Sequence, residues 1–197
     1  ANFWMYTFSC CCLMNLMSPF INDIWLGEGY LFDEMIVLLI VVKTYITGMR
    51  SAVQTFKNAK GLYWQNRYMP IYESLINLVA SLILVHTMSV AGVILGTIIS
   101  SLTTCVWVEP RVLYKYGFNK SARDYVARYV QYFLVFFVVM AVTYTCNRFI
   151  EGSSIGVFIL RCIVSAGIPN IMLLLIYAKT EEFRYFYGLL MRKLRKH

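Results

Sequence analysis

Residues 70–108 of the chain read PIYESLINLVASLILVHTMSVAGVILGTIISSLTTCVWV. The stretch contains two apolar runs, Pro70–His86 and Val90–Val108. Each run is close to the roughly 20 helical residues that cross a hydrocarbon core. The connection between them, His86–Val90, is very short and contains no acidic residue, lysine or arginine. The second run must therefore return beside the first, and the sequence predicts an antiparallel helical hairpin in a membrane.

Four further apolar runs lie on either side of this hairpin: Phe3–Ile21, Met35–Phe56, Val130–Asn147 and Ile155–Ala178. Only 14% of the chain is charged, whereas a soluble domain has about 25% charged residues. The mean hydropathy is +0.62. The sequence therefore predicts an all-α integral membrane protein. We expect a bundle of about six transmembrane helices over residues 1–178 and a basic amphipathic tail over residues 179–197.

The charged residues alternate between successive connections. Of the 18 lysines and arginines, 14 lie in three segments, which are Lys57–Arg67, Arg111–Arg128 and Lys179–Lys196. The connection Asn22–Glu34 has four acidic residues and no basic one. Because basic loops stay in the cytoplasm, we expect a multi-pass topology with both ends of the chain cytoplasmic. Membrane insertion and anionic lipids thus account for the net charge of +8, and we expect no nucleic-acid partner.

The residues that usually carry out catalysis or bind metals form no recognisable pattern. The six cysteines make no CxxC pair and no Cys/His metal spacing, and buried apolar thiols explain them best. His86 stands alone at the end of a run, and Glu73 has no second carboxylate on its predicted helix. No glycine-rich phosphate loop is present. We therefore expect no enzymatic activity, no metal site and no cofactor.

Polar residues share one face of the second predicted span. They are Lys43, Thr47, Arg50, Ser51 and Gln54. Such a stripe faces other helices or water rather than lipid. Lys43 lies about 12 Å from the outer end of its run, and Arg161 lies about 9 Å into the sixth run, at 1.5 Å per residue. Either cation could extend its side chain to the membrane surface, but the depth of Lys43 favours a cavity.

Steps of four residues also occur in the third and fourth spans. The third carries Glu73, Asn77 and Ser81, and the fourth carries Gly92, Gly96, Ser100 and Thr104. A polar face in the third span again predicts contact with helices or water. The small residues of the fourth predict a close approach between two helices.

Four segments together resemble a known family. They are NDIWLGEGY at 22–30, KNAKGLYWQNRYMPIYESLINLVASLILV at 57–85, AGVILGTIISSL at 91–102 and VEPRVLYKYGF at 108–118. In order and spacing they resemble the C-terminal half of the polysaccharide biosynthesis flippases. These are the O-antigen and capsule repeat-unit translocases of the multidrug/oligosaccharidyl-lipid/polysaccharide exporter superfamily. The resemblance runs from about Pro19 to Arg184.

This resemblance implies one lobe of a two-lobe transporter in the bacterial cytoplasmic (inner) membrane, with the N-terminal bundle as its missing partner. It implies that the cargo is an undecaprenyl-diphosphate-linked oligosaccharide, flipped by alternating access. Lys43 and Arg161 would then face the diphosphate or acidic sugars. Thr47, Gln54, Asn77 and Ser81 would exchange hydrogen bonds with sugar hydroxyls.

Two other functions compete with this interpretation. The first is a drug or small-solute exporter of the same superfamily, although an excess of cavity cations disfavours cationic drugs. The second is a membrane-embedded glycan polymerase or glycosyltransferase. The longest predicted outer connection has only about a dozen residues, which disfavours such an enzyme.

Overall fold

The computed structural model describes residues 1–27, 33–152, 154–185 and 188. Every regular element in these residues is helical. The α-helices are α1 (Asn2–Pro19), α2 (Glu34–Ala59), α3 (Met69–Ser100), α4 (Val106–Val112), α5 (Arg123–Arg148) and α6 (Ile155–Tyr177). Short π-helical or 3-10 segments are η1 (Phe20–Trp25), η2 (Trp64–Asn66), η3 (Ser101–Cys105) and η4 (Leu113–Gly117). The structure therefore confirms the predicted all-α class.

Four helical segments of the described chain are long and apolar enough to cross a membrane. They are Glu34–Ala59, Trp64–Gly117, Arg123–Arg148 and Ile155–Tyr177. The second has 54 residues and includes the predicted hairpin. These segments are those of a membrane protein. The bundle of six crossings and its place as one lobe stay predictions.

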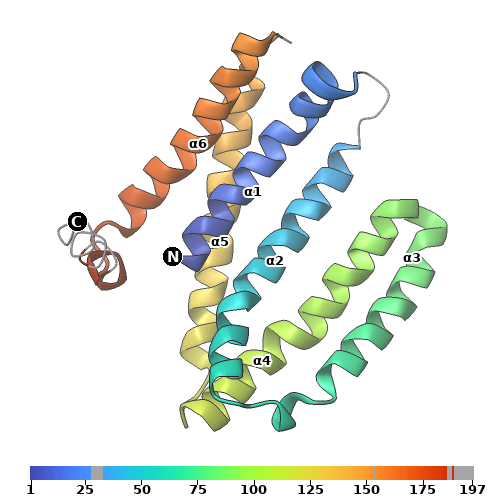
Figure 1. Ribbon diagram of the computed structural model, residues 1–197, viewed down its shortest axis with the longest axis vertical. Helices are drawn as coiled ribbons and strands as arrows, with labels where there is room; N and C mark the ends of the chain where they lie inside the picture. The colour runs from blue at the N-terminus through green and yellow to red at the C-terminus, as the bar shows by residue number, and fades with distance from the viewer. Residues whose placement is uncertain (28–32, 153, 186–187, 189–197) are drawn as a thin grey trace.

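The predicted hairpin is present inside α3, which reverses direction at Ser89. Ser89 has φ 49° and ψ −126°, a backbone conformation that non-glycine residues rarely adopt. The two limbs of α3 then run side by side (Figure 1). Thr97 Oγ1 donates to Asn77 Oδ1 across them at 3.4 Å. The reversal thus divides one apolar element into two antiparallel helices, as the short connection indicated.

Glycines allow the two limbs of α3 to touch. A Cβ atom added at Gly92 would overlap the backbone carbonyl of Leu84. A Cβ atom added at Gly96 would lie 2.8 Å from the backbone nitrogen of Ser81. Any larger side chain must therefore push the limbs apart, and the predicted close approach is confirmed.

The bundle core forms where α1 packs between α2, α5 and α6. Cys10 of α1 and Val41 of α2 are fully buried there, as are Phe136 of α5 and Leu173 of α6. The rings of Tyr45 and Phe136 stack with their centroids 4.0 Å apart. Van der Waals packing of this kind holds helices together in a bilayer, where lipid is as apolar as the side chains.

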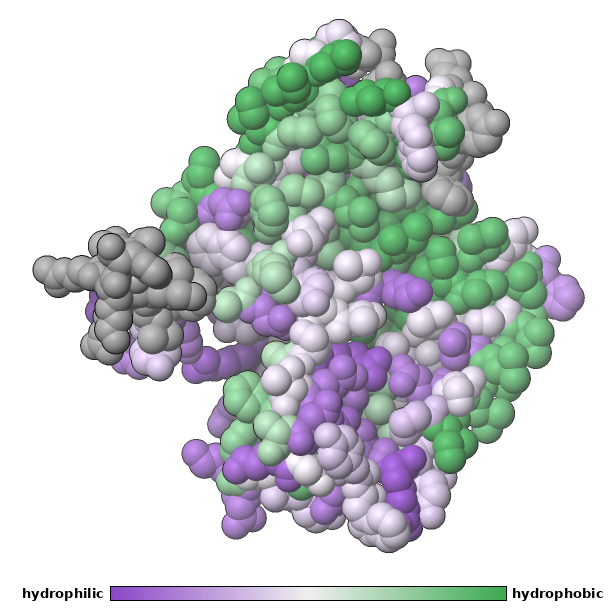
Figure 2. Space-filling model, viewed as in Figure 1, coloured by the Kyte–Doolittle hydropathy of each residue, from purple (hydrophilic) through white to green (hydrophobic). Residues whose placement is uncertain are grey.

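The first limb of α3 stands at the side of this bundle with an apolar outer face. Ile71, Leu75, Leu78 and Leu82 are each between 57% and 61% exposed. Figure 2 shows continuous hydrophobic surface along this edge of the molecule. A helix face of this composition suits contact with lipid or with another apolar helix.

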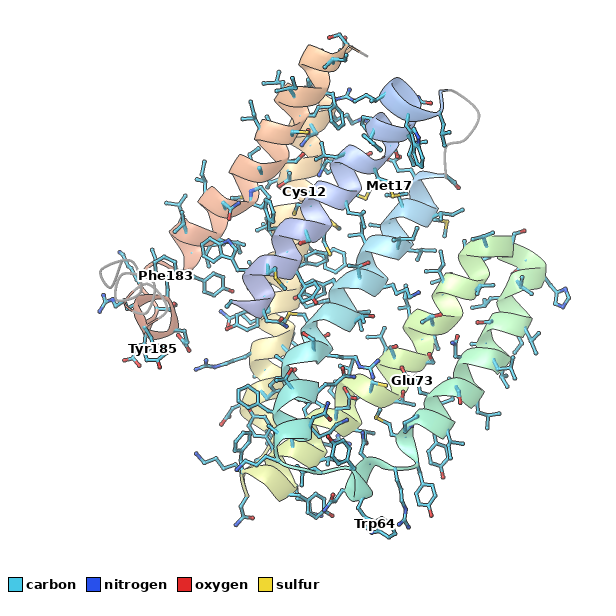
Figure 3. The ribbon with its side chains drawn as sticks, in the orientation of Figure 1. Cys12, Met17, Trp64, Glu73, Phe183 and Tyr185 are labelled. Carbon is cyan, nitrogen blue, oxygen red and sulfur yellow. The ribbon has the colours of Figure 1, made fainter. Side chains whose placement is uncertain are left out.

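Aromatic and basic side chains mark one end of the molecule. Trp64 lies at this end, far from Met17 (Figure 3), and the Arg67 guanidinium stacks 3.7 Å from the Trp64 ring centroid. We call this the inner end, following the predicted topology, and the opposite end, with Trp25, the outer end. Tryptophan at the end of a span suits the depth of lipid headgroups.

Candidate functional site

Four charged side chains meet between α2, α3 and α4, and we call them the ion cluster. Arg50 and Lys57 of α2 supply the cations, and Glu73 of α3 and Glu109 of α4 supply the anions. Arg50 Nη1 lies 3.0 Å from Glu73 Oε1, and Arg50 Nε lies 3.1 Å from Glu109 Oε2. Lys57 Nζ lies 3.3 Å from Glu109 Oε1. The cluster is neutral as a whole, so its burial leaves no net charge.

Glu109 is the centre of this cluster. Its side chain is only 1% exposed. It accepts from Arg50 Nε and Nη2, from Gln54 Nε2 at 3.1 Å and from Lys57 Nζ. Two-point binding of a carboxylate by a guanidinium is among the strongest hydrogen-bonded arrangements in proteins. Glu109 therefore ties α4 to α2 at the inner half of the bundle.

Glu73 brings the first limb of α3 into the same cluster. Ser101 Oγ donates to Glu73 Oε1 at 3.2 Å, in addition to the bond from Arg50. Glu73 lies between α3 and the rest of the bundle (Figure 3), and its side chain is 25% exposed. Cys105, fully buried, lies beside Thr104 on η3. The hairpin is thus attached to α2 by charge as well as by packing.

The sequence did not predict this cluster. It placed Arg50 in a polar stripe and left Glu73 as a single carboxylate, because Glu109 lies 59 residues from Arg50. One signal was available: Arg50, Gln54 and Lys57 follow at steps of four and three, so three donors share one helix face. Donors at such depth require an acceptor from another helix.

Lys43 and Thr47 lie on α2 above the cluster, and both side chains are exposed. No hydrogen bond or ion pair engages either side chain within the described residues. Lys43 is nine residues into α2, about 14 Å along the axis at 1.5 Å per residue. Lys43 is thus an exposed cation well inside a helix that is long and apolar enough to cross a membrane, and its place in a cavity stays a prediction.

This exposed face of α2 lies between α1 and α3. On one side Asn2 Nδ2 donates to the Gly48 carbonyl at 2.8 Å. On the other side Ile46 packs with Ile98 in the second limb of α3. Figure 1 shows α2 between these two elements. We call Lys43, Thr47 and Gln54, which follow one another along α2 at steps of four and seven residues, the α2 polar face.

The other predicted site residues lie elsewhere. Ser81 Oγ donates to Asn77 Oδ1 at 3.1 Å, and both side chains are half-buried between the limbs of α3. Gln54 is on the α2 polar face, but its Nε2 donates a hydrogen bond to Glu109. Arg161 lies on α6 and donates to the Ile150 carbonyl at 2.8 Å. Lys43 and Thr47 thus share an exposed face of α2, and within the described residues no hydrogen bond or ion pair joins Gln54, Asn77, Ser81 or Arg161 to them.

Arg161 instead lines a cavity of about 250 Å³, which we call the outer pocket. Four helices meet there, and its polar lining includes Asn15, Glu34, Tyr144, Asn147, Arg148 and Arg161. The Tyr144 hydroxyl donates to Glu34 Oε1. Two buried atoms of this lining, Asn147 Oδ1 and Arg161 Nε, have no hydrogen-bond partner in the described part of the chain. Each such group costs about 1–3 kcal/mol if it stays unpaired.

A second cavity, of about 550 Å³, lies between the start of α1, α5 and the end of α6. Its walls are mainly apolar and aromatic, including Phe3, Trp4 and Tyr132. Arg128 and Glu182 pair at its edge, 2.6 Å apart, with 63% and 60% of their side chains exposed. Hydrogen bonds from its own backbone and from Arg128 lower the pKa of Glu182. An exposed pair of this kind contributes little to stability.

The described residues contain no group of three histidine, cysteine or acidic side chains placed to bind a metal ion. All six cysteines are free thiols. Comparison of the chain with protein-family models, curated proteins and solved structures finds no match.

Proposed function

We propose that this chain is part of a transporter that flips undecaprenyl-diphosphate-linked oligosaccharides across the bacterial cytoplasmic membrane by alternating access. The observation that carries the proposal is the exposed Lys43, nine residues into α2 and without a hydrogen bond or ion pair among the described residues. A lysine at the centre of a membrane span costs roughly 2.5–3.5 kcal/mol on insertion scales. That cost arises because lipid cannot solvate the ammonium group. Water in a cavity and an anionic cargo would both solvate it.

The α2 polar face has the chemistry that such a cargo needs. Lys43 offers one positive charge for a diphosphate or an acidic sugar. Thr47 is exposed beside it and can exchange hydrogen bonds with sugar hydroxyls as these leave bulk water. The polyprenyl tail would remain in the bilayer while the glycan passes along this face.

The ion cluster favours motion of α2, α3 and α4 as a unit. Arg50 contacts Glu73 on α3 and Glu109 on α4 at the same time. Helices joined by a buried, satisfied network move together, because separating them would expose unpaired charges. We therefore propose that α2, α3 and α4 rock as one body against a second lobe.

The test is export by variants of the complete protein, expressed in cells that depend on it, with its abundance measured in parallel. Lys43→Ala should reduce export strongly, and Lys43→Arg should retain much of it because the charge remains. Lys60→Ala is the matched control, because Lys60 is an exposed lysine just beyond the end of α2.

Normal export by Lys43→Ala at normal abundance would contradict the proposal. Efflux of a cationic drug that does not depend on Lys43, without export of lipid-linked glycan, would instead indicate the drug-exporter alternative.

A further inference from the structure

The larger cavity, of about 550 Å³, lies between the start of α1, α5 and the end of α6, and we call it the α1–α5–α6 cavity. Its volume is within the range of about 300–1,000 Å³ that is usual for ligand sites. Contacts within the bundle already fix its wall. The rings of Phe3 and Tyr132 stack with their centroids 4.5 Å apart, and Trp4 Nε1 donates to Asn170 Oδ1 at 2.7 Å. The cavity is therefore preformed, and its aromatic wall suits an apolar chain.

Side chains of both charges lie at the edge of this cavity. Arg128 and Glu182 are the charged side chains of its described lining, and Arg128 Nη1 lies 2.6 Å from Glu182 Oε1. Because 63% and 60% of these side chains are exposed, a ligand can reach both. Within the described residues the Arg128 side chain donates only through Nη1. Its Nε and Nη2 therefore remain available to a second acceptor.

The cavity lies beside segments that favour a membrane surface. Arg128 and Lys179 belong to the basic segments that the sequence predicts on the cytoplasmic side. Two of the walls come from α5 and α6, and each of these helices is long and apolar enough to cross a membrane. Pockets of this kind between transmembrane helices, with basic groups on the cytoplasmic side, bind lipid headgroups. A phospholipid with one acyl chain in the cavity would have its headgroup at Arg128 and Glu182.

The two opposite charges favour one kind of headgroup. A guanidinium binds phosphate oxygens through parallel N–H donors. A primary ammonium group has three donors for a carboxylate, whereas the quaternary ammonium of choline has no N–H. An acidic headgroup such as phosphoglycerol would be repelled by Glu182. Arg128 and Glu182 thus complement a zwitterion that carries a phosphate and a primary amine.

We propose that the α1–α5–α6 cavity binds a phosphoethanolamine lipid. One acyl chain lies among the aromatic side chains, the phosphate binds Arg128 and the ammonium group binds Glu182. The bound lipid joins the start of α5 to the segment after α6. Because Lys43 and Thr47 are on α2 and do not line this cavity, the site does not depend on the transport proposal.

Trp4 can report occupancy, because it lines the cavity. The complete protein, with every other tryptophan replaced by phenylalanine, is placed in phosphatidylcholine bilayers. Lipids with brominated acyl chains, which quench tryptophan fluorescence on contact, are added at rising mole fraction with a phosphoethanolamine, phosphocholine or phosphoglycerol headgroup. The phosphoethanolamine lipid should reach half-maximal quenching at a mole fraction about two- to fivefold lower than the others, the range for exposed charged contacts. The same lipid should raise the unfolding temperature of the parent protein most, because it binds the folded state.

Variants at the edge make the assignment specific. Glu182→Gln should remove the preference for phosphoethanolamine over phosphoglycerol, because the carboxylate that distinguishes them is lost. Arg128→Gln should weaken quenching by both lipids about two- to fivefold. Lys179→Gln, at an exposed position outside the lining, is the control and should change neither.

Three results would overturn the proposal: equal quenching by the three headgroups, stronger quenching by phosphoglycerol, or a preference for phosphoethanolamine that survives Glu182→Gln. If the protein with Trp4 alone does not fold, the unfolding temperatures of the parent and the same variants in the three lipids decide the question by the same comparisons.

Discussion

Glu109→Gln tests the ion cluster with the smallest change of shape. The substitution removes one buried negative charge and turns one acceptor oxygen into an N–H₂ donor. Glu73 is then the one carboxylate left in the cluster, and it pairs with Arg50. Lys57 loses its ion pair, because that pair was with Glu109. Removing one partner of a buried ion pair costs about 3–5 kcal/mol. At about 2–4 °C per kcal/mol for a domain of this length, the unfolding temperature should fall by roughly 6–20 °C.

The assay uses Cys105, which is fully buried beside the cluster. In a background with the other five cysteines replaced, the rate of maleimide labelling at Cys105 is measured against temperature in detergent. The midpoint should move down in Glu109→Gln. The matched control is Glu182→Gln, which removes an ion pair of similar length that is about 60% exposed. Its effect should stay below about 1 kcal/mol.

A second substitution separates lost charge from lost shape. Lys57→Gln, added to Glu109→Gln, restores neutrality, because Arg50 then pairs with Glu73. The double variant should be more stable than the sum of the two single effects, since contacting residues are not additive. If the unfolding temperature of Glu109→Gln stays within about 4 °C of the parent, the limit that the same conversion gives for the control, the cluster does not hold α2 to α4.

Two further predictions concern packing and topology. Gly96→Ala should lower the unfolding temperature, because the new Cβ meets Ser81. Gly167→Ala is the control: its new Cβ meets no atom within 4 Å in the described residues, so it should be neutral or stabilising. Equal effects of the two variants on the unfolding temperature would mean that the limbs of α3 can separate freely. A cysteine at position 60 should react with an impermeant thiol reagent only after cells are opened, and labelling in intact cells would reverse the predicted topology.

The local pattern of the sequence predicted the helices and the hairpin well. Spacing and apolar runs depend on neighbouring residues, so the reversal near Ser89 and the glycine contacts of α3 were foreseeable. The ends of the helices were predicted less well. The fifth apolar run begins at Val130, but α5 begins at Arg123. Hydropathy marks only the part of a helix that suits lipid, and charged residues such as Asp124 can extend it into the headgroups.

The candidate site depended on contacts that the pattern did not contain. Periodicity placed Lys43 and Thr47 on one face, and the structure leaves both exposed. The periodicity could not indicate which residue of another helix each polar side chain contacts. Asn77 turned inward to Ser81 because the return limb lies against it, and Arg161 joined a separate pocket because α6 meets α1 and α5 there. Such pairings are decided by the packing of whole helices.

The proposed transport requires the α2 polar face to line a hydrated pathway. Thr47 and Leu78 allow a matched comparison, because each lies near the middle of its helix or limb and each is exposed in the structure. Their difference is in the exposed side chains one turn away, which are Lys43 for Thr47 on α2 and Leu75 and Leu82 for Leu78 on α3.

The measurement is the labelling rate of single cysteines by a small, charged thiosulfonate reagent in membranes that hold the complete protein. Thr47→Cys should react quickly, and a lipid-linked glycan substrate should slow the reaction. Leu78→Cys should react slowly, because lipid excludes the charged reagent. Equal, slow labelling at both positions would contradict the account, since the face of α2 that carries Lys43 would then be dry.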